Sequence, residues 1–367
     1  MARHLKEFNV KCFRGIKNLQ LQNMNDINIL TGDNNAGKTS VLEVINYLSG
    51  ITDLRNLIYG TRKAMNAVHA KEMSEFDKLM FLFPADNGGN QTISYTFTLK
   101  NEDVKVKINK NVVIETLSRE ELKELSYRSD YFIPYELLNQ NISFDIRKMN
   151  LSFYVNDKKI TKSFHEFART IYSNENEYHY IDTTYISPIK HADSTVHLSQ
   201  IFDNPILYGE MLEILKEFDE GIISINADKL SEYSSATVYS ILSKYNDKAI
   251  PLNFYGDGMK KAILLISSVI SAKNGILLLD EFETAIHTTA MNCVFEWILK
   301  ACMKFNVQLF LTSHSLEAIE KVLKCCPDLS DHINLYTLYR KGNQTLVRSL
   351  SCAEAIEAND KLGLELR

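Results

Sequence analysis

The sequence predicts an α/β protein built on a phosphate-binding loop, with a mostly parallel core sheet, an amino-terminal antiparallel β subdomain and a β-rich insertion. Three observations support this. The stretch ILTGDNNAGKTSVLEVI at 29–45 places glycines and a lysine between an apolar strand and an amphipathic helix. The stretch NGILLLDEFE at 274–283 is typical of a buried parallel strand ending in two acids. Alternating apolar and polar runs between them predict an antiparallel meander.

The composition is that of an ordinary globular protein. Its 367 residues can bury a sizeable core, and 45% hydrophobic with 24% charged residues fits one large or two modest domains. A net charge of −5 argues against an obligate nucleic-acid coat protein. Since we find neither a signal core nor a long apolar run, we expect a cytoplasmic protein without a membrane span. The six cysteines lack metal-site spacing and are expected to be reduced.

The remaining elements follow from periodicity along the chain. The first part should hold strands at 6–13, 16–22 and 27–31 and a helix over 38–49. The last part should end in a β-hairpin around Gly342 and a short helix. Between the meander and that hairpin, we expect strands near 183–188, 222–226, 237–243, 249–254, 276–280 and 308–313, and helices near 205–218, 259–272, 289–305 and 315–324.

A change of texture between about 60 and 180 indicates an insertion. Four short alternating runs lie there, SYTFTL, VKVKI, ISFDI and LSFYV, separated by Asn, Asp and Lys turns. We expect residues 90–160 to form an antiparallel sheet packed on the amino-terminal strands. The predicted organisation is a split core domain over 1–60 and 180–350, an inserted meander and loop region over 60–180, and a C-terminal helix over 351–367.

The pattern Gly32-x-x-x-x-Gly37-Lys38-Thr39 has the residues that a phosphate-binding loop needs. Glycines let backbone N–H groups turn toward a phosphate, and the helix N-terminus adds partial positive charge. Lys38 would reach the β- and γ-phosphates of ATP, and the Thr39 hydroxyl would ligate Mg²⁺. A plain glycine-rich turn is the competing interpretation. The predicted nucleotide-binding residues here are Asn34, Asn35, Ala36, Gly37, Lys38, Thr39 and Ser40.

The acidic strand end supplies the carboxylates that a phosphate-binding loop needs for Mg²⁺ and for the attacking water. A buried parallel strand would deliver Asp280 beside the loop to hold Mg²⁺, and Glu281 would orient or polarise the attacking water. Taken alone, a core strand followed by an acidic helix cap explains both residues equally well. The upstream loop decides in favour of the metal and catalytic roles.

Two more stretches are candidates for contact with phosphate. His314 follows the strand QLFLTS, where it could hydrogen-bond the γ-phosphate, although a lone histidine is more often a cap or packing residue. Gly256, Asp257 and Gly258 open a helix and could form an anion site. Simple N-capping by Asp257 competes with that interpretation. The two are compatible if this helix end meets a phosphate on another subunit.

In this order, the motifs resemble those of ABC-type ATPase heads, and within them the AAA15 (OLD-like) ATPases of bacterial defence loci. The order is FRG, GxxxxGKT, an insertion, a Gly-x-Gly helix start, a DE strand end and SHS. The resemblance covers about residues 1–50 and 180–340, so the split domain would be the ATPase. It implies that Arg14 lies near the nucleotide, with a surface salt bridge as the alternative. After Gly258 the chain has Lys260 but lacks the serine-containing transporter signature.

Some family positions match and others differ. Glu283 and His287 match, whereas Thr284-Ala285 stands where the family often has Asn-Gly. No family glutamine is obvious before the inserted helical region, and Ser187 or His191 occupies that area.

The resemblance implies an ATPase head that uses ATP and Mg²⁺. We find neither long heptad runs nor room for a nuclease domain after His314. A stand-alone head would dimerise or form higher oligomers on ATP and regulate an effector encoded nearby, a nuclease or toxin in anti-phage defence, with DNA a possible trigger. Two alternatives stay open. One is a RecF-like DNA-repair clamp using basic residues at 105–110 and 146–148, and the other is a non-hydrolysing scaffold, against which Glu281 argues.

Overall fold

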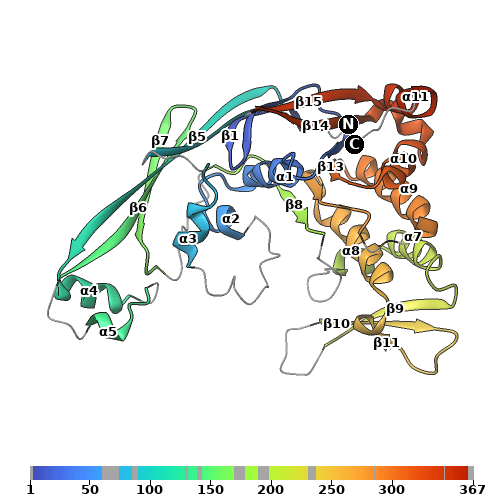
Figure 1. Cartoon of the computed structure of the whole chain (residues 1–367). Coiled ribbons are helices and arrows are strands. Elements are labelled where there is room, and N and C mark those ends of the chain that lie inside the picture. Colours follow the sequence, from blue (N-terminus) through green and yellow to red (C-terminus); the bar gives the residue numbers. More distant parts are fainter. Residues whose placement is uncertain are drawn as a thin grey trace.

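Three β-sheets organise the chain. The computed structural model describes residues 3–59, 74–84, 90–128, 131–138, 143–168, 178–188, 198–229, 237–284, 286, 288–342 and 344–362. These residues form two six-stranded sheets and one three-stranded sheet, with helices gathered around one of the large sheets (Figure 1). Within these segments, no helix combines the length and the apolar character needed to cross a membrane.

The first large sheet is antiparallel and joins the amino-terminal strands to the insertion. Its order is β2-β1-β4-β5-β6-β7, so β4 of the insertion pairs directly with β1. The antiparallel sheet expected over 90–160, packed on the amino-terminal strands, is therefore confirmed. Its strands are β1 Leu5–Phe13, β2 Ile16–Leu21, β4 Asn90–Leu99, β5 Glu102–Leu117, β6 Phe144–Val155 and β7 Lys158–His165.

The insertion has fewer interruptions than the sequence predicted. The runs ISFDI and LSFYV are not separate strands, because β6 continues through Met149 in unbroken register with β5. The edge strand β7 was not predicted. Its sequence KKITKSFH carries lysines rather than a clear apolar alternation, as exposed edges often do.

The second large sheet is the core of the molecule, and its mostly parallel character is confirmed. Its order is β15-β14-β3-β13-β12-β8, and every neighbouring pair is parallel except the β14–β15 hairpin. The carboxyl ends of β3, β12 and β13 therefore meet at one edge. Its strands are β3 Ile27–Gly32, β8 Thr183–Ile186, β12 Ile276–Leu279, β13 Gln308–Thr312, β14 Ile333–Lys341 and β15 Gln344–Ser351.

The core sheet is buried on both faces, which explains its continuous apolar runs. Leu277 and Leu279 of β12 pack into a cluster with the later helices. Ile276 and Leu278 pack into a second cluster, shared with the first helix and the antiparallel sheet. The second cluster includes residues of α1 Lys38–Asn46 and of the 3₁₀ turn η1 Tyr47–Ser49. The first cluster includes residues of α6 Ser199–Phe202, α7 Pro205–Leu215, α8 Asp257–Ser271, α9 Thr288–Lys304, α10 Leu316–Lys324 and α11 Cys352–Leu362.

One predicted strand is largely wrong. Only two residues of 249–254 are in a strand, because Pro251 has no N–H with which to extend the ladder, and a 3₁₀ turn follows. This small sheet lies beyond the helices of the core (Figure 1). It consists of β9 Ile222–Lys229, β10 Thr237–Ser243 and β11 Ile250–Pro251, followed by η3 Leu252–Phe254.

The long strands β5 and β6 extend as an arm whose tip carries two short helices (Figure 1). A separate hydrophobic cluster holds this tip, formed by Leu117, Leu122, Ile133 and Ile146. The first of these two tip helices, α4, begins with a capping box between Ser118 and Glu121. The short elements are α2 Leu54–Tyr59, α3 Glu75–Met80, α4 Arg119–Ser126, α5 Tyr135–Leu138 and η4 Pro327–His332.

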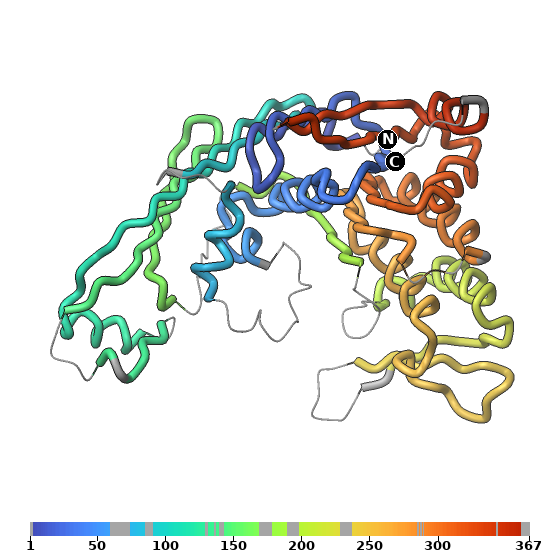
Figure 2. Tube along the Cα trace, viewed as in Figure 1, coloured from blue at the N-terminus to red at the C-terminus, as the bar shows by residue number. Residues whose placement is uncertain are grey.

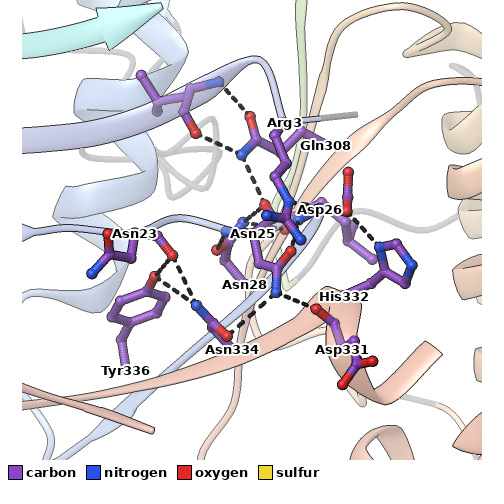
Figure 3. A network of polar contacts seen from close by, with 12 residues as sticks. Arg3, Asn23, Asn25, Asp26, Asn28, Gln308, Asp331, His332, Asn334 and Tyr336 are labelled. Atoms are coloured by element: carbon purple, nitrogen blue, oxygen red, sulfur yellow. Dashed lines mark hydrogen bonds and ion pairs between the residues drawn. The ribbon is translucent and has the colours of Figure 1, made fainter. Parts of the chain in front are cut away.

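The two ends of the described chain are joined side by side. Strand β14 pairs with β3, and β15 lies beside β2, so the last strands run along the first ones (Figure 2). A polar network closes the amino-terminal ends of β3, β13 and β14 (Figure 3). In it, the fully buried Asp26 lies 2.7 Å from Nδ1 of His332 and 3.4 Å from Nε of Arg3.

Candidate functional site

The loop between β3 and α1 has a backbone that suits its residues. Gly32 has φ +130°, and a β-carbon there would stand 2.0 Å from the Leu338 carbonyl oxygen. Gly37 has φ +106° and Asn35 φ 64°, values that glycine and asparagine adopt most readily. The glycines are therefore required by the turn itself. The nucleotide contacts predicted for Asn34, Asn35, Ala36 and Ser40 stay predictions.

Lys38 opens α1 and turns back onto the loop. Its Nζ donates to the carbonyls of Gly32 at 2.7 Å and Asp33 at 3.0 Å. It also lies 3.5 Å from Nδ1 of His314, so the structure brings these two predicted site residues together. Burial lowers the pKa of the Lys38 amine, and Asp280 is the strongest of the nearby acids that oppose this shift. The ammonium is thus held at the centre of the loop.

Asp280 is the most heavily bonded side chain of the site. It is 3% exposed and accepts hydrogen bonds from Thr39 Oγ1 at 3.1 Å, Thr312 Oγ1 at 2.6 Å and Tyr185 OH at 3.0 Å. The expected pair of Thr39 and Asp280 is thus in direct contact. Hydroxyl and carboxylate oxygens are ligands that Mg²⁺ prefers, so these residues fit the ion. Across the described residues, no group of three or more His, Cys, Asp or Glu side chains could hold a metal instead.

Glu281 lies next to this pair in a strained backbone conformation. Its φ is 45°, in the left-handed region, which costs a non-glycine residue on the order of 1–3 kcal/mol. Its N–H donates to Thr312 Oγ1 at 2.8 Å, which holds the turn. Its carboxylate is half-buried and acts electrostatically on Lys38. Strain of this kind is often found at functional sites.

Glu283 anchors the strand end that carries the histidine. Its Oε1 accepts from Ser313 Oγ at 2.7 Å and from the His314 N–H at 3.3 Å. Its Oε2 is buried and has no hydrogen-bond partner among the described residues. Glu283 therefore fixes the backbone of His314 rather than its ring.

Arg14 makes an ion pair, but not a surface one. Its Nη1 lies 2.5 Å from Glu43 Oε2, and the Glu43 side chain is fully buried in α1. The alternative of a salt bridge is therefore correct in kind, whereas its surface location is wrong. The Arg14 side chain is 23% exposed, and its proximity to a nucleotide stays a prediction.

The glycine motif before α8 begins the helix and leaves open space beside Gly256. Gly256 is the N-cap residue, and a β-carbon there would meet nothing within 4 Å. Asp257 is the first helical residue and pairs with Lys260 at 2.6 Å, so the competing interpretation of N-capping by Asp257 is wrong.

Sequence reasoning missed several side chains of the site. Tyr185 and Thr312 both bond Asp280, and each stands on a strand next to β12. The sequence feature that could have identified them is a polar residue near the end of a strand predicted to lie beside the acidic strand. Ser187 is buried just after β8. The alternative residue His191 and the family position His287 lie outside the described residues.

A protein-family model matches residues 27–320, which is most of the chain. Its description is "AAA domain, putative AbiEii toxin, Type IV TA system". The chain belongs to this family. The match spans the phosphate loop, the insertion, the acidic strand end and His314. All these parts of the chain therefore belong to one AAA-domain match.

Individual proteins agree with that assignment. An ATP/GTP phosphatase of Helicobacter pylori is 23% identical over 345 residues, covering 86% of each chain. An uncharacterised protein of Methanocaldococcus jannaschii is 32% identical over 113 residues, covering 30% of this chain and 98% of that protein. The SMC head bound to the C-winged helix domain of ScpA superposes with a TM-score of 0.50 at 12% identity, covering 96% and 99% of the two chains. The AAA-domain chain therefore has the fold of an ABC-type ATPase head.

Proposed function

We propose that the protein binds and hydrolyses ATP as an AAA15 (OLD-like) ATPase. The observation that carries this is the contact between Thr39 and Asp280 beside Lys38, with the two hydroxyl and carboxylate oxygens 3.1 Å apart. Lys38 would exchange its loop carbonyls for β- and γ-phosphate oxygens, which bind an ammonium more strongly. Thr39 and Asp280 would hold Mg²⁺, which neutralises phosphate charge when bound.

Two further side chains would act at the γ-phosphate. Nδ1 of His314 lies 3.5 Å from Nζ of Lys38, so both side chains can reach one phosphate group. Glu281, next to Asp280, would accept a hydrogen bond from the attacking water and draw off its proton. The name of the Helicobacter pylori relative, an ATP/GTP phosphatase, supports hydrolysis.

Dimerisation on ATP completes the proposed mechanism. The helix end at Gly256 has open space beside it, because a β-carbon on Gly256 would meet nothing within 4 Å. It could therefore meet the nucleotide of a second subunit, where its N–H groups would face the γ-phosphate. In this arrangement, ATP links two subunits until it is hydrolysed.

The proposed output is regulation of an effector, a nuclease or toxin in anti-phage defence. The family description, which names a putative toxin of a Type IV TA system, supports a role of the protein in such a system. A RecF-like clamp has less support, because three of its five candidate basic residues are buried or paired, although Lys105 and Lys107 are exposed. Lys110 is 3% exposed, Arg147 pairs with Glu166 at 2.6 Å, and Lys148 pairs with Glu115 at 3.0 Å.

The test is Lys38→Ala, measured as equilibrium binding of ATP and as phosphate release with Mg²⁺. We expect nucleotide binding to weaken roughly 10- to 150-fold, because a hydrogen bond to a charged group contributes about 1.5–3 kcal/mol. Phosphate release should fall to background. The matched control is Lys216→Ala, since within the described residues this exposed lysine pairs with Glu213 of α7 alone. Unchanged ATP binding by Lys38→Ala would overturn the proposed function.

A further inference from the structure

Lys261 of α8 is a buried cation close to the site. Its side chain is 0% exposed, which is rare for lysine. Within the described residues, its Nζ makes one hydrogen bond, to the Pro188 carbonyl, at the long distance of 3.5 Å. Burying an ammonium with so little compensation is costly, so other charges must stabilise it.

The stabilising charges are the acids of the candidate site. Glu283 acts most strongly on the Lys261 amine, followed by Asp280 and Glu281. Burial nevertheless lowers the pKa of Lys261 to about 8, so the amine is mostly charged at neutral pH. On its own helix, Asp257 is paired with Lys260 instead. Lys261 therefore interacts electrostatically with the acids of the candidate site.

Glu283, like Lys261, is incompletely hydrogen-bonded within the described residues, and its charge is opposite. One of its oxygens holds Ser313 and the His314 N–H, at 2.7 and 3.3 Å. The other oxygen, Oε2, is buried and lacks a hydrogen-bond partner among the described residues. A weakly bonded ammonium and an unsatisfied carboxylate oxygen of opposite charge thus coexist in the same buried region. A direct ion pair between Lys261 and Glu283 would satisfy both groups.

We propose that Lys261 is a positioning residue for hydrolysis, whose ammonium pairs with Glu283 when the nucleotide site closes and thereby holds His314 at the γ-phosphate. This inference rests on the proposed ATPase function. Closure would strengthen the pair because expelling water lowers the local dielectric constant. Since α8 also carries the open end at Gly256, contact with a second subunit would move Lys261 and the site together.

The experiment compares steady-state ATP hydrolysis by wild type, Lys261→Met and Lys261→Arg. Lys261→Met keeps the apolar stem but removes the charge, so kcat should fall roughly 10- to 150-fold, the effect of one charged hydrogen bond. KM and the ATP Kd should change less than about twofold, because Lys261 acts through Glu283. Lys261→Arg should restore most of kcat. The control is Lys300→Met, at an exposed lysine of α9.

A double-variant cycle identifies the partner. Glu283→Gln should lower kcat about as much as Lys261→Met, and combining the two should cost little more than either alone, because both remove the same pair. Thermal denaturation monitors folding, and if Lys261→Met fails to fold, Lys261→Arg and Glu283→Gln carry the test. A loss confined to KM, an additive double variant, or a wild-type kcat in Lys261→Met would overturn the inference.

These outcomes separate the inference from the function on which it rests. Hydrolysis that requires Lys38 but not Lys261 contradicts the inference alone. Hydrolysis that survives Lys38→Ala, or a wild type that releases no phosphate under any condition tested, contradicts both.

Discussion

At the scale of single residues, one glutamine side chain supplies hydrogen bonds to backbone groups that no strand pairing satisfies. Gln308 is fully buried at the start of β13. Its amide accepts from the Leu5 N–H at 2.7 Å, donates to the Leu5 carbonyl at 2.8 Å, and donates to the Asn25 carbonyl at 2.9 Å (Figure 3). It thereby fastens the first strand of the antiparallel sheet to the core sheet. Buried backbone groups at this seam are satisfied by a side chain rather than by a ladder.

Gln308→Ala should therefore destabilise the whole fold. The change leaves the backbone groups of Leu5 and Asn25 without these partners, and we expect the free energy of unfolding to fall by about 2–4 kcal/mol. Urea denaturation measures this. Gln344→Ala, at an exposed position of β15, is the control and should change stability by less than about 0.5 kcal/mol. Equal stability of the two variants would show that the seam does not depend on Gln308.

At the scale of elements, the arm has its own core. Leu122 of α4 is fully buried in the cluster that holds the tip of β5 and β6. Ile146 of that cluster lies opposite Glu115. Met149, three residues further along β6, belongs instead to the large cluster shared by α1 and the antiparallel sheet. The same strand thus contributes to two cores on its two faces, as a period of two residues requires. The tip is packed independently of the nucleotide site.

Leu122→Ala should loosen the tip without affecting the site. Truncating a buried leucine costs about 2–5 kcal/mol. Hydrogen exchange should speed up over 119–126 and stay unchanged over 27–46, with the same ATP affinity as the wild type. Ile114→Ala, on the same arm but 72% exposed, should change neither. Faster exchange around the phosphate loop in Leu122→Ala would mean that the arm and the site are coupled.

At the scale of the whole molecule, the proposed dimer would complete the candidate site. Lys38, Thr39, Asp280 and His314 converge, and the helix end at Gly256 has open space beside it. A head-to-tail pair of subunits would bring each helix end to the other's loop. The nucleotide would then be the link between subunits, and its hydrolysis would release them.

Glu281→Gln should trap that pair. Gln keeps the size of the side chain but loses the charge that polarises water, so hydrolysis should slow by roughly 10²–10⁴-fold while ATP binding persists. Light scattering should show dimers or larger assemblies with ATP but not with ADP.

Gly256→Trp in the Glu281→Gln background should abolish this association by obstructing the helix end. Gly209→Trp is the control, because a β-carbon at either glycine meets nothing within 4 Å. Wild-type hydrolysis by Glu281→Gln, or association that ignores Gly256→Trp, would contradict the dimer mechanism.

The sequence alone determined the local parts of this protein. Gly32, Gly37 and Lys38 identified the loop because the turn demands backbone angles that few residues adopt. Asp280 and His314 were found because apolar strands of a parallel sheet end at a common edge. The division into domains at 60, 180 and 350 stays a prediction.

Only the tertiary structure decided which side chains meet. Tyr185 and Thr312 bond Asp280 because β8 and β13 flank β12, an order that no local period reveals. Lys261 looked like one of two adjacent helix lysines, yet it is buried beside acids some twenty residues away in the chain. Periodicity specifies which face of a helix or strand is apolar. Which other element packs against that face depends on non-local packing, and this packing brought the charged side chains of the site together.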